Sequence, residues 1–382
     1  MDLIAFQICS LSPLSLKESA PGMGELCGGV FLNLRFQALV KSRMGVAAFQ
    51  NLLDRKPKAW AVALRYFEDY VKKNFDPLKS RSRHDDNKFN VPLPGAQDNA
   101  AAGIDCGFFT LSLAETSEIF RPLVDTVIEL VERQRNALLA NGKTAKGVIL
   151  VGGFGQSGYL FKCLKSRFAH EDSPAANNQI VRRSSIRHDS NLVVLQPANA
   201  WTAVVRGAVL SSIQEKTVLS RQARRHYGVL INEVYDASKH SLKNKYWDVF
   251  DEVYMARNQN FWYTKKGDDL LTDQPTLFRF VKVWAYEDPI PEYVADSIII
   301  SDAAVASQEF DWSLVPEMRV LCRLNANLSK VPRSLYRDHI NSRGIRYRSL
   351  EYEIGMTVKS GCIIWDLRVN GVVHGEVQAD FE

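Results

Sequence analysis

A glycine-rich turn between a short apolar run and a helix constrains this chain more than any other segment. Residues 147–151 (GVILV) show no alternation of apolar and polar residues, which is typical of a strand covered on both faces. The glycine turn 152–158 (GGFGQSG) follows, and then apolar residues recur at helical spacing. A second apolar run, 192–195 (LVVL), precedes another helical run. Strand, turn, helix, strand and helix in this order predict an α/β unit.

A turn of this kind is able to bind an anion. Main-chain N–H groups of glycines approach a phosphate without interference from Cβ atoms, and the N-terminus of the following helix adds a favourable dipole. The turn therefore predicts a nucleotide contact at Gly152, Gly153, Phe154 and Gln156. The other explanation for these glycines is close packing of the strand against the helix, with no ligand.

The same turn supports a second hypothesis, an NAD(P)-binding oxidoreductase. Gly153, Gly155 and Gly158 satisfy the G-x-G-x-x-G pattern of dinucleotide-binding folds. Two features weaken this interpretation. The next predicted strand ends in Gln196 and Pro197, where a ribose-binding acid would be expected, and no second βαβ half clearly follows.

The periodicity of the sequence changes near residue 216. Before it, helices are expected over residues 30–44, 60–75, 117–139 and 200–213, with strands at 2–6 and 108–113 and an exposed loop over 76–104. After it, short alternating strands dominate, ending in an Asn370-Gly371 turn. We expect an α/β domain over residues 1–216 and a mostly β domain over 217–382.

Composition excludes several classes of protein. A net charge of +5 over 382 residues is too dilute to indicate nucleic-acid binding, and the six cysteines include no CxxC pair that would suggest zinc. No long apolar stretch indicates a membrane span, and no leader precedes the first strand, so a reducing, cytoplasmic setting is expected. A basic cluster at 182–188 lacks interleaved aromatic residues and is expected to be a solvated loop.

Several segments, in order along the chain, resemble the actin-like ATPase superfamily, and most of all a divergent branch of the heat shock protein 70 (DnaK-like) family. Residues 147–168 (GVILVGGFGQSGYLFKCLKSRF) are similar to the adenosine loop of that family. Residues 25–33 resemble the segment after its second phosphate loop, where Gly28 and Gly29 precede a helix. Residues 200–210 resemble its hinge helix. The resemblance implies a nucleotide-side lobe of an actin-like fold in the first domain.

A further segment resembles the helix that flanks adenine and ribose in this family. Residues 67–75 (FEDYVKKNF) contain Glu68, Lys72 and Lys73 at the matching positions, which implies that these side chains contact ATP or ADP. The alternative is that the lysines only form ion pairs with Glu68 and Asp69 on a solvated helix.

The β domain continues the resemblance. Residues 224–228, 262–268 and 364–371 are similar to the start, middle and end of the chaperones' substrate-binding β-sandwich. This implies recognition of unfolded or extended peptides, although Trp262 and Tyr263 have the alternative role of core residues in a half-buried strand.

The departures from the family pattern decide the expected activity. A complete member carries an Asp-x-Gly-Thr-type loop, a catalytic lysine and metal-orienting carboxylates, and then an Asp-x-Gly-Gly-Gly-Thr loop, and this sequence contains none of them. The resemblance therefore implies an N-terminally truncated chaperone-type protein that binds ATP or ADP weakly, with Mg²⁺ expected only in a full-length form. No ATP hydrolysis is expected, because phosphoryl transfer depends on positioned cations and donors. A missing lobe also implies an exposed face and possible self-association.

Overall fold

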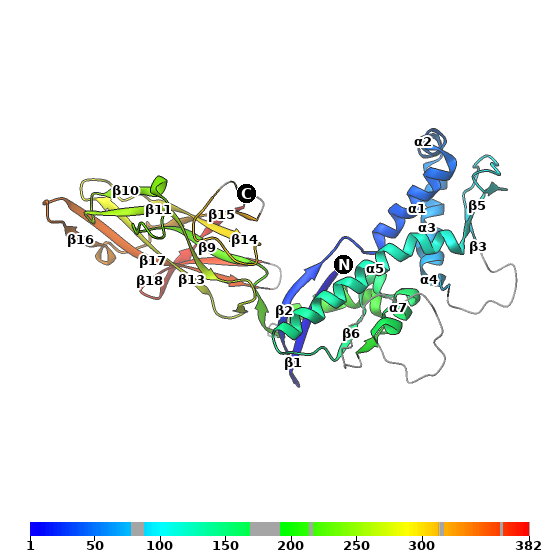
Figure 1. The fold of residues 1–382 in the computed structure, drawn as a ribbon, viewed down its shortest axis with the longest axis horizontal. Helices are drawn as coiled ribbons and strands as arrows, with labels where there is room; N and C mark the ends of the chain where they lie inside the picture. Colours follow the sequence, from blue (N-terminus) through cyan, green and yellow to red (C-terminus); the bar gives the residue numbers. More distant parts are fainter. Residues whose placement is uncertain are drawn as a thin grey trace. The chain divides into compact units, whose positions relative to one another are not determined.

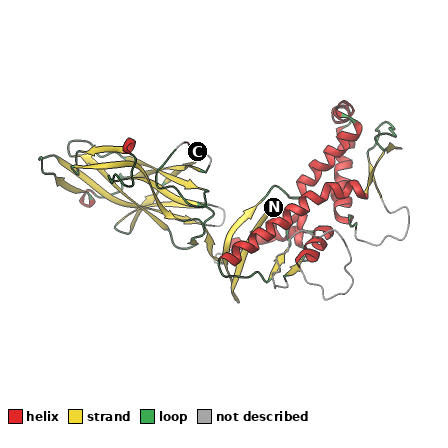
Figure 2. Cartoon of the chain, in the orientation of Figure 1, coloured by secondary structure: helices red, strands yellow, loops and turns green. Residues whose placement is uncertain are grey.

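The computed structural model describes residues 1–77, 88–168, 192–213, 217–311, 313, 317–359 and 362–381 (Figures 1 and 2). The chain forms two compact units, Met1–Ala5 with Gly22–Glu215 and Phe6–Pro21 with Lys216–Glu382. Long helices occur in the first unit, whereas strands dominate the second (Figure 2). Helices and sheets are thus both present, as an α/β class requires. The expected basic loop at 182–188 lies outside the described residues.

One segment of the expected first domain belongs to the second unit. Phe6–Pro21 lies with the C-terminal residues because β2 (Leu14–Gly24) pairs in parallel with β8 (Val218–Gln222). Glu18 reinforces this pairing, since its carboxylate accepts a hydrogen bond of 2.8 Å from the backbone N–H of Gln222. The local pattern of residues 2–6 predicted a strand at the start of the chain. It did not indicate that the next strand, β2, would pair with residues 218–222.

The helices of the first unit follow the expected periodicity with one interruption. They are α1 (Gly29–Met44), α2 (Val46–Arg55), α3 (Pro57–Tyr66), the π-helix η1 (Phe67–Val71), α4 (Lys72–Asn74), α5 (Leu113–Ala140), α6 (Gly152–Gly155), α7 (Gly158–Phe168), the 3-10 helix η3 (Ala200–Thr202) and α8 (Ala203–Ile213). The single helix expected over residues 60–75 is therefore broken by a π-helical turn. Helix α5 begins at a capping box, in which Ser112 and Glu115 satisfy each other's backbone N–H groups.

The strands of the first unit correct two expectations. The loop expected over residues 76–104 contains β3 (Lys88–Pro92), which pairs with β5 (Phe108–Ser112), and β5 also pairs with β4 (Ile104–Asp105). The two short parallel strands β6 (Gly147–Ile149) and β7 (Val193–Leu195) pair with each other, but they are not covered on both faces as the apolar runs predicted. Ile149, Val193 and Leu195 are exposed on one face of this pair.

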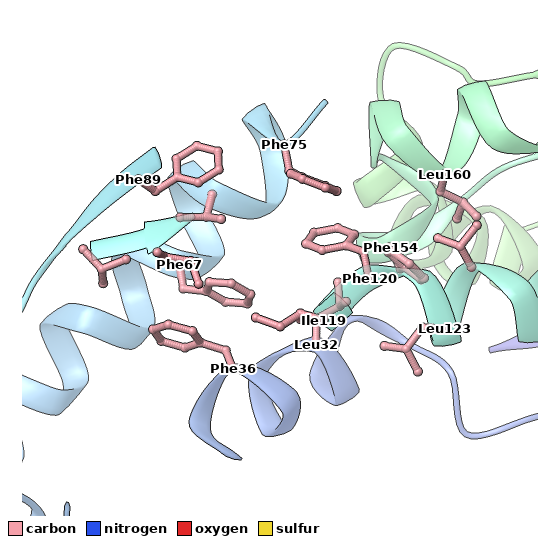
Figure 3. Close-up of a cluster of buried hydrophobic side chains, with 14 of the residues drawn as sticks. Leu32, Phe36, Phe67, Phe75, Phe89, Ile119, Phe120, Leu123, Phe154 and Leu160 are labelled. Atoms are coloured by element: carbon pink, nitrogen blue, oxygen red, sulfur yellow. The ribbon is translucent and has the colours of Figure 1, made fainter. Parts of the chain in front are cut away.

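Aromatic side chains form the centre of the first unit. Phe36 of α1 is fully buried and stacks on Phe67 with ring centroids 4.3 Å apart, and Phe109 of β5 packs edge-on against it. Figure 3 shows how Phe75, Phe120 and their apolar neighbours continue this cluster toward α6 and α7. The core thereby joins α1, the π-helix and the glycine turn in one packed body.

The described strands of the second unit belong to three sheets, and the first of these sheets also includes residues 2–5 and 22–24, which are assigned to the first unit. The first has the order β1 (Asp2–Leu11), β2, β8, β12 (Asp269–Leu271). The second has six strands in the order β10 (Lys245–Asp248), β11 (Val253–Thr264), β9 (His226–Val234), β14 (Tyr293–Ser301), β15 (Met318–Asn327), β20 (Gln378–Phe381). The third has the order β13 (Thr276–Ala285), β17 (Arg346–Val358), β18 (Ile363–Val369), β19 (Val372–Glu376), and β16 (Arg337–Ile340) also pairs with β17.

The six-stranded and five-stranded sheets share one hydrophobic core. Val229 and Leu324 reach it from the six-stranded sheet, and Phe278, Tyr352 and Trp365 reach it from the five-stranded sheet. All five side chains are buried. The alternation expected from the sequence therefore marks strands that bury one face.

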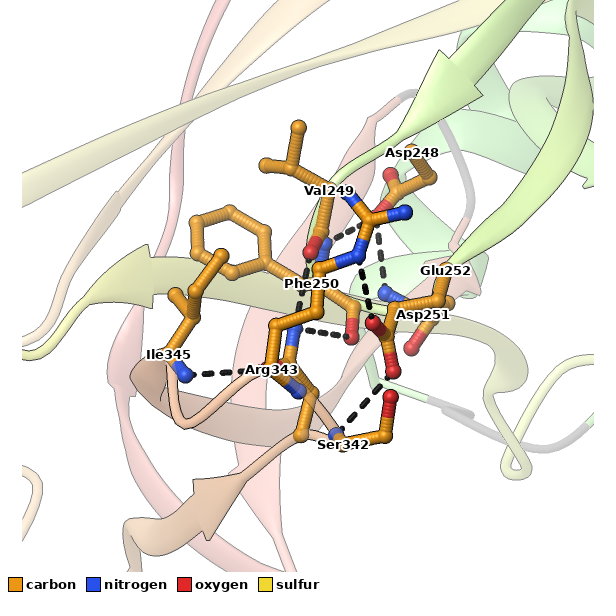
Figure 4. Close-up of polar contacts among 9 residues, drawn as sticks. Asp248, Val249, Phe250, Asp251, Glu252, Ser342, Arg343 and Ile345 are labelled. Atoms are coloured by element: carbon orange, nitrogen blue, oxygen red, sulfur yellow. Dashed lines mark hydrogen bonds and ion pairs between the residues drawn. The ribbon is translucent and has the colours of Figure 1, made fainter.

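A polar contact links a turn of each of these two sheets (Figure 4). Glu252, in the β10–β11 turn, accepts a hydrogen bond from the backbone N–H of Ser342 at 3.0 Å and pairs with Arg343 at 3.2 Å. The side-chain amide of Asn341 donates to the carbonyl of Val249 at 2.9 Å. These contacts fix the β16–β17 turn against the β10–β11 turn.

Candidate functional site

Three of the predicted nucleotide-binding segments meet at the N-terminus of α1. A Cβ atom added at Gly29 would lie 3.9 Å from the backbone nitrogen of Phe154 and 4.0 Å from Nζ of Lys72. Gly29 therefore lies beside Lys72 and the glycine turn, which are about forty and more than 120 residues away in the sequence, respectively. We call Gly29, Asn33, Glu68, Lys72 and Phe154 the Lys72 cluster.

Lys72 is the central cation of the cluster. Its ammonium group donates a hydrogen bond of 2.8 Å to the carbonyl of Gly29 and lies 3.6 Å from the Glu68 carboxylate. The side chain is only 17% exposed, and this burial lowers the pKa of Lys72 although Glu68 acts in the opposite direction. A partly desolvated ammonium group gains more from a ligand oxygen than a fully hydrated one.

Glu68 and Asn33 form the polar edge of the cluster. The Asn33 amide donates to Oε1 of Glu68 at 2.7 Å, while the Glu68 side chain stays half exposed and keeps acceptor capacity toward solvent. The Asn33 amide oxygen is buried and accepts no hydrogen bond from any residue in the described ranges. A buried acceptor without a donor costs free energy unless a ligand or water supplies one. Glu68 lies in the π-helical turn, and Lys72 follows this turn directly. Turns of this kind are frequent at functional sites.

The glycine turn offers an open backbone surface at the two residues that precede Phe154, which contacts Gly29. Gly152 has φ of +81°, in the left-handed region that favours glycine, and no atom lies within 4 Å of a Cβ built at Gly152 or Gly153. A ligand is therefore able to approach the main chain at these two residues. Phe154 differs, because its ring is buried in the aromatic core and its backbone nitrogen and Cβ atom border Gly29.

Gln196 holds the turn in place. Its side-chain amide, at the end of β7, donates to the carbonyls of Gly155 and Ser157 at 2.8 and 3.1 Å. At the position where the dinucleotide pattern requires a ribose-binding acid, the chain therefore has Gln196, whose amide N–H groups are already bound to the turn. A Cβ at Gly155 would lie 3.1 Å from the backbone carbon of Leu150, so this glycine serves helix packing. Gln196 is thus not the acidic residue that the dinucleotide pattern requires, and the Gly155 contact agrees with the alternative explanation of close packing.

The remaining predicted residues lie at the margin. Gly28 precedes α1 as its N-cap and has open space around its Cβ position. Lys73 extends away to pair with Asp69 at 3.2 Å, with more than half of its side chain exposed. Gln156 is exposed at the C-terminal end of α6. Asn33 and Gln196, which were not predicted as site residues, make more hydrogen bonds around the site than these three residues do. The sequence contains no motif that identifies a single Asn in a helix or a single Gln after a strand as part of a site.

Within the described ranges, no group of three or more His, Cys, Asp or Glu side chains is placed to hold a metal ion. No helix in the same ranges is long and apolar enough to cross a membrane. In comparisons with known proteins, no family model matches this chain and no curated protein matches it.

Proposed function

We propose that the first unit binds the adenosine part of ATP or ADP at the Lys72 cluster and does not hydrolyse the nucleotide. The observation that carries this proposal is the meeting of a partly desolvated ammonium group, an unpaired buried amide oxygen and an open glycine backbone in one place. We further propose that the chain is related to the heat shock protein 70 family, with a first unit of the actin-like type.

Each group of the cluster would have a distinct role in holding a nucleoside. The Glu68 carboxylate would accept hydrogen bonds from ribose hydroxyls, because half of its side chain is open to solvent. The Lys72 ammonium would donate to a ligand oxygen or ring nitrogen, and the Asn33 oxygen would accept from a ligand N–H. Gly152 and Gly153 would let the ligand approach the main chain.

We expect no hydrolysis because the sequence lacks the groups that this reaction requires. Phosphoryl transfer depends on cations and donors positioned about the γ-phosphate, and this sequence contains no Asp-x-Gly-Gly-Gly-Thr string. The described residues include no carboxylate cluster suited to Mg²⁺, so no step is assigned to a metal. The cluster accordingly supports binding and not catalysis.

For the second unit we propose a role in recognising unfolded or extended peptides, as a β-sandwich of the chaperone type. The two sheets with a common core support this role, since edge strands are able to bind extended segments. None of the six cysteines, all of which lie in the described ranges, forms a disulfide, and we propose a reducing, cytoplasmic setting.

Replacing Lys72 by methionine should weaken the binding of adenosine and of ADP by about tenfold or more, because a charge-assisted hydrogen bond contributes about 1.5 to 3 kcal/mol. Isothermal titration calorimetry on the whole chain measures this. Lys73→Met is the matched control, since Lys73 is adjacent but pairs with Asp69 outside the cluster, and it should change either affinity by less than about twofold. Equal effects of the two substitutions, or no binding to the unaltered protein, would contradict the proposal.

A further inference from the structure

Helix α8 has an apolar sequence but contains no buried residue. Between Ala203 and Ile213 (AVVRGAVLSSI), Arg206 is the one charged residue, and no residue of the helix is buried. Val204, Val205, Val209, Leu210 and Ile213 are between 53% and 74% exposed. A helix that is apolar on all sides is normally buried. The composition of α8 is therefore typical of a buried helix, although its side chains are exposed in the single chain.

The β6–β7 pair presents a second exposed apolar surface. Val194 is buried and Val148 packs against the core, whereas Ile149, Val193 and Leu195 on the opposite face are at least half exposed. Parallel strands are usually covered on both faces. In the described part of the chain each of the two strands also has one unpaired edge.

The two surfaces are connected through adjacent segments. Strand β6 leads into α6, and β7 leads through η3 into α8, while α6 and η3 contact each other. Val151 and Trp201, both exposed, lie in these connections. We call the combined set the apolar face, which comprises Ile149, Val151, Val193, Leu195, Trp201, Val204, Val205, Val209, Leu210 and Ile213.

We propose that the apolar face is the surface through which two copies of this chain associate. Ten large apolar side chains, each at least 45% exposed, provide an area on the order of the ~800 Å² per partner that a standard interface buries. This exceeds the ~300 to 600 Å² of the largest patch on a typical monomer. The inference does not depend on nucleotide binding.

The composition of the face is compatible with pairing to itself. A two-fold interface brings the same patch of both copies together, so it must contain few like charges, and Arg206 is the one charge on α8. Val205, Val209 and Ile213 recur every four residues and therefore lie on one side of α8, against which the second copy would pack.

Sedimentation velocity of the whole chain, from low to high micromolar concentration, tests the proposal. The unaltered protein should be dimeric at high concentration and dissociate on dilution. Val205→Asp should weaken the dimer by at least about 100-fold, because the carboxylate would be buried without a partner. Since Val205 is exposed in the single chain, this substitution should leave the circular dichroism spectrum unchanged.

The control is Leu242→Asp, at a leucine of the second unit that is more exposed than Val205, and this substitution should leave the dimer intact. Hydrogen exchange provides a second measurement, in which the amides of β6 and α8 should become slower as concentration rises. A protein that stays monomeric, a dimer that Val205→Asp does not weaken, or a monomer that instead binds phosphatidylcholine vesicles would overturn the proposal.

Discussion

Replacing Phe36 by alanine should lower the free energy of unfolding of the first unit by about 3 to 5 kcal/mol, the usual cost of removing a buried aromatic side chain. Phe36 is fully buried. It stacks on Phe67 at 4.3 Å and on Trp60 at 5.8 Å, and it packs edge-on against Phe109 at 6.3 Å. The substitution would leave a cavity between α1, the π-helix and β5, which rigid packing does not refill.

The same substitution should also weaken nucleotide binding, because Phe67 begins the π-helical turn that contains Glu68. Chemical denaturation and calorimetric titration of the whole chain measure the two effects. Leu34→Ala is the control on the same helix, and since Leu34 is more than half exposed it should cost less than about 0.5 kcal/mol. A cost for Phe36→Ala no larger than for Leu34→Ala would show that this cluster is not the core of the unit.

Replacing Asp296 by alanine should destabilise the second unit by about 3 kcal/mol, since removing one partner of a buried ion pair leaves the other uncompensated. Asp296 is 8% exposed, on β14 of the six-stranded sheet. It binds Nζ of Lys282 at 2.5 Å and accepts a hydrogen bond from the Tyr352 hydroxyl, both from the five-stranded sheet. Burial and the nearby carboxylate both raise the pKa of Tyr352, so the phenol remains a donor.

The expected loss lies at the lower end of the usual range because the Lys282 side chain is about one third exposed and would regain some hydration. Chemical denaturation monitored by tryptophan fluorescence measures this loss in the free energy of unfolding. Asp338→Ala, which removes an exposed partner of Arg348, should cost less than about 1 kcal/mol. If both substitutions had the same effect, the contact between the two sheets would contribute nothing beyond a surface ion pair.

The parts of the fold that local pattern predicted are those with strong periodicity. Helices α1 and α5 occur where apolar spacing predicted them, and the glycine-rich segment after β6 connects a strand to a helix as expected, although its first residues form the short helix α6. The π-helical turn was not predicted, because one extra residue in a turn leaves no periodic sign. Strand β3 was missed since its surroundings are rich in Pro, Asn and Asp, which usually indicate loops.

Long-range contacts account for the other differences. The pairing of β2 with β8 joins segments about two hundred residues apart, which local periodicity does not detect. An apolar run such as 147–151 indicates that a strand should be covered, but not which element covers it. At the site, the resemblance indicated Lys72 and Gly29, whereas the roles of Asn33 and Gln196 became visible only through their hydrogen bonds.

The affinities of adenosine, ADP and ATP for the whole chain, compared by calorimetry, test most directly whether the site holds the nucleoside alone. The three ligands should bind within about threefold of one another, which corresponds to less than ~1 kcal/mol, and no phosphate should be released from ATP. ATP bound at least about tenfold more tightly than adenosine, or released phosphate, would contradict the account because the phosphates would then have a site of their own.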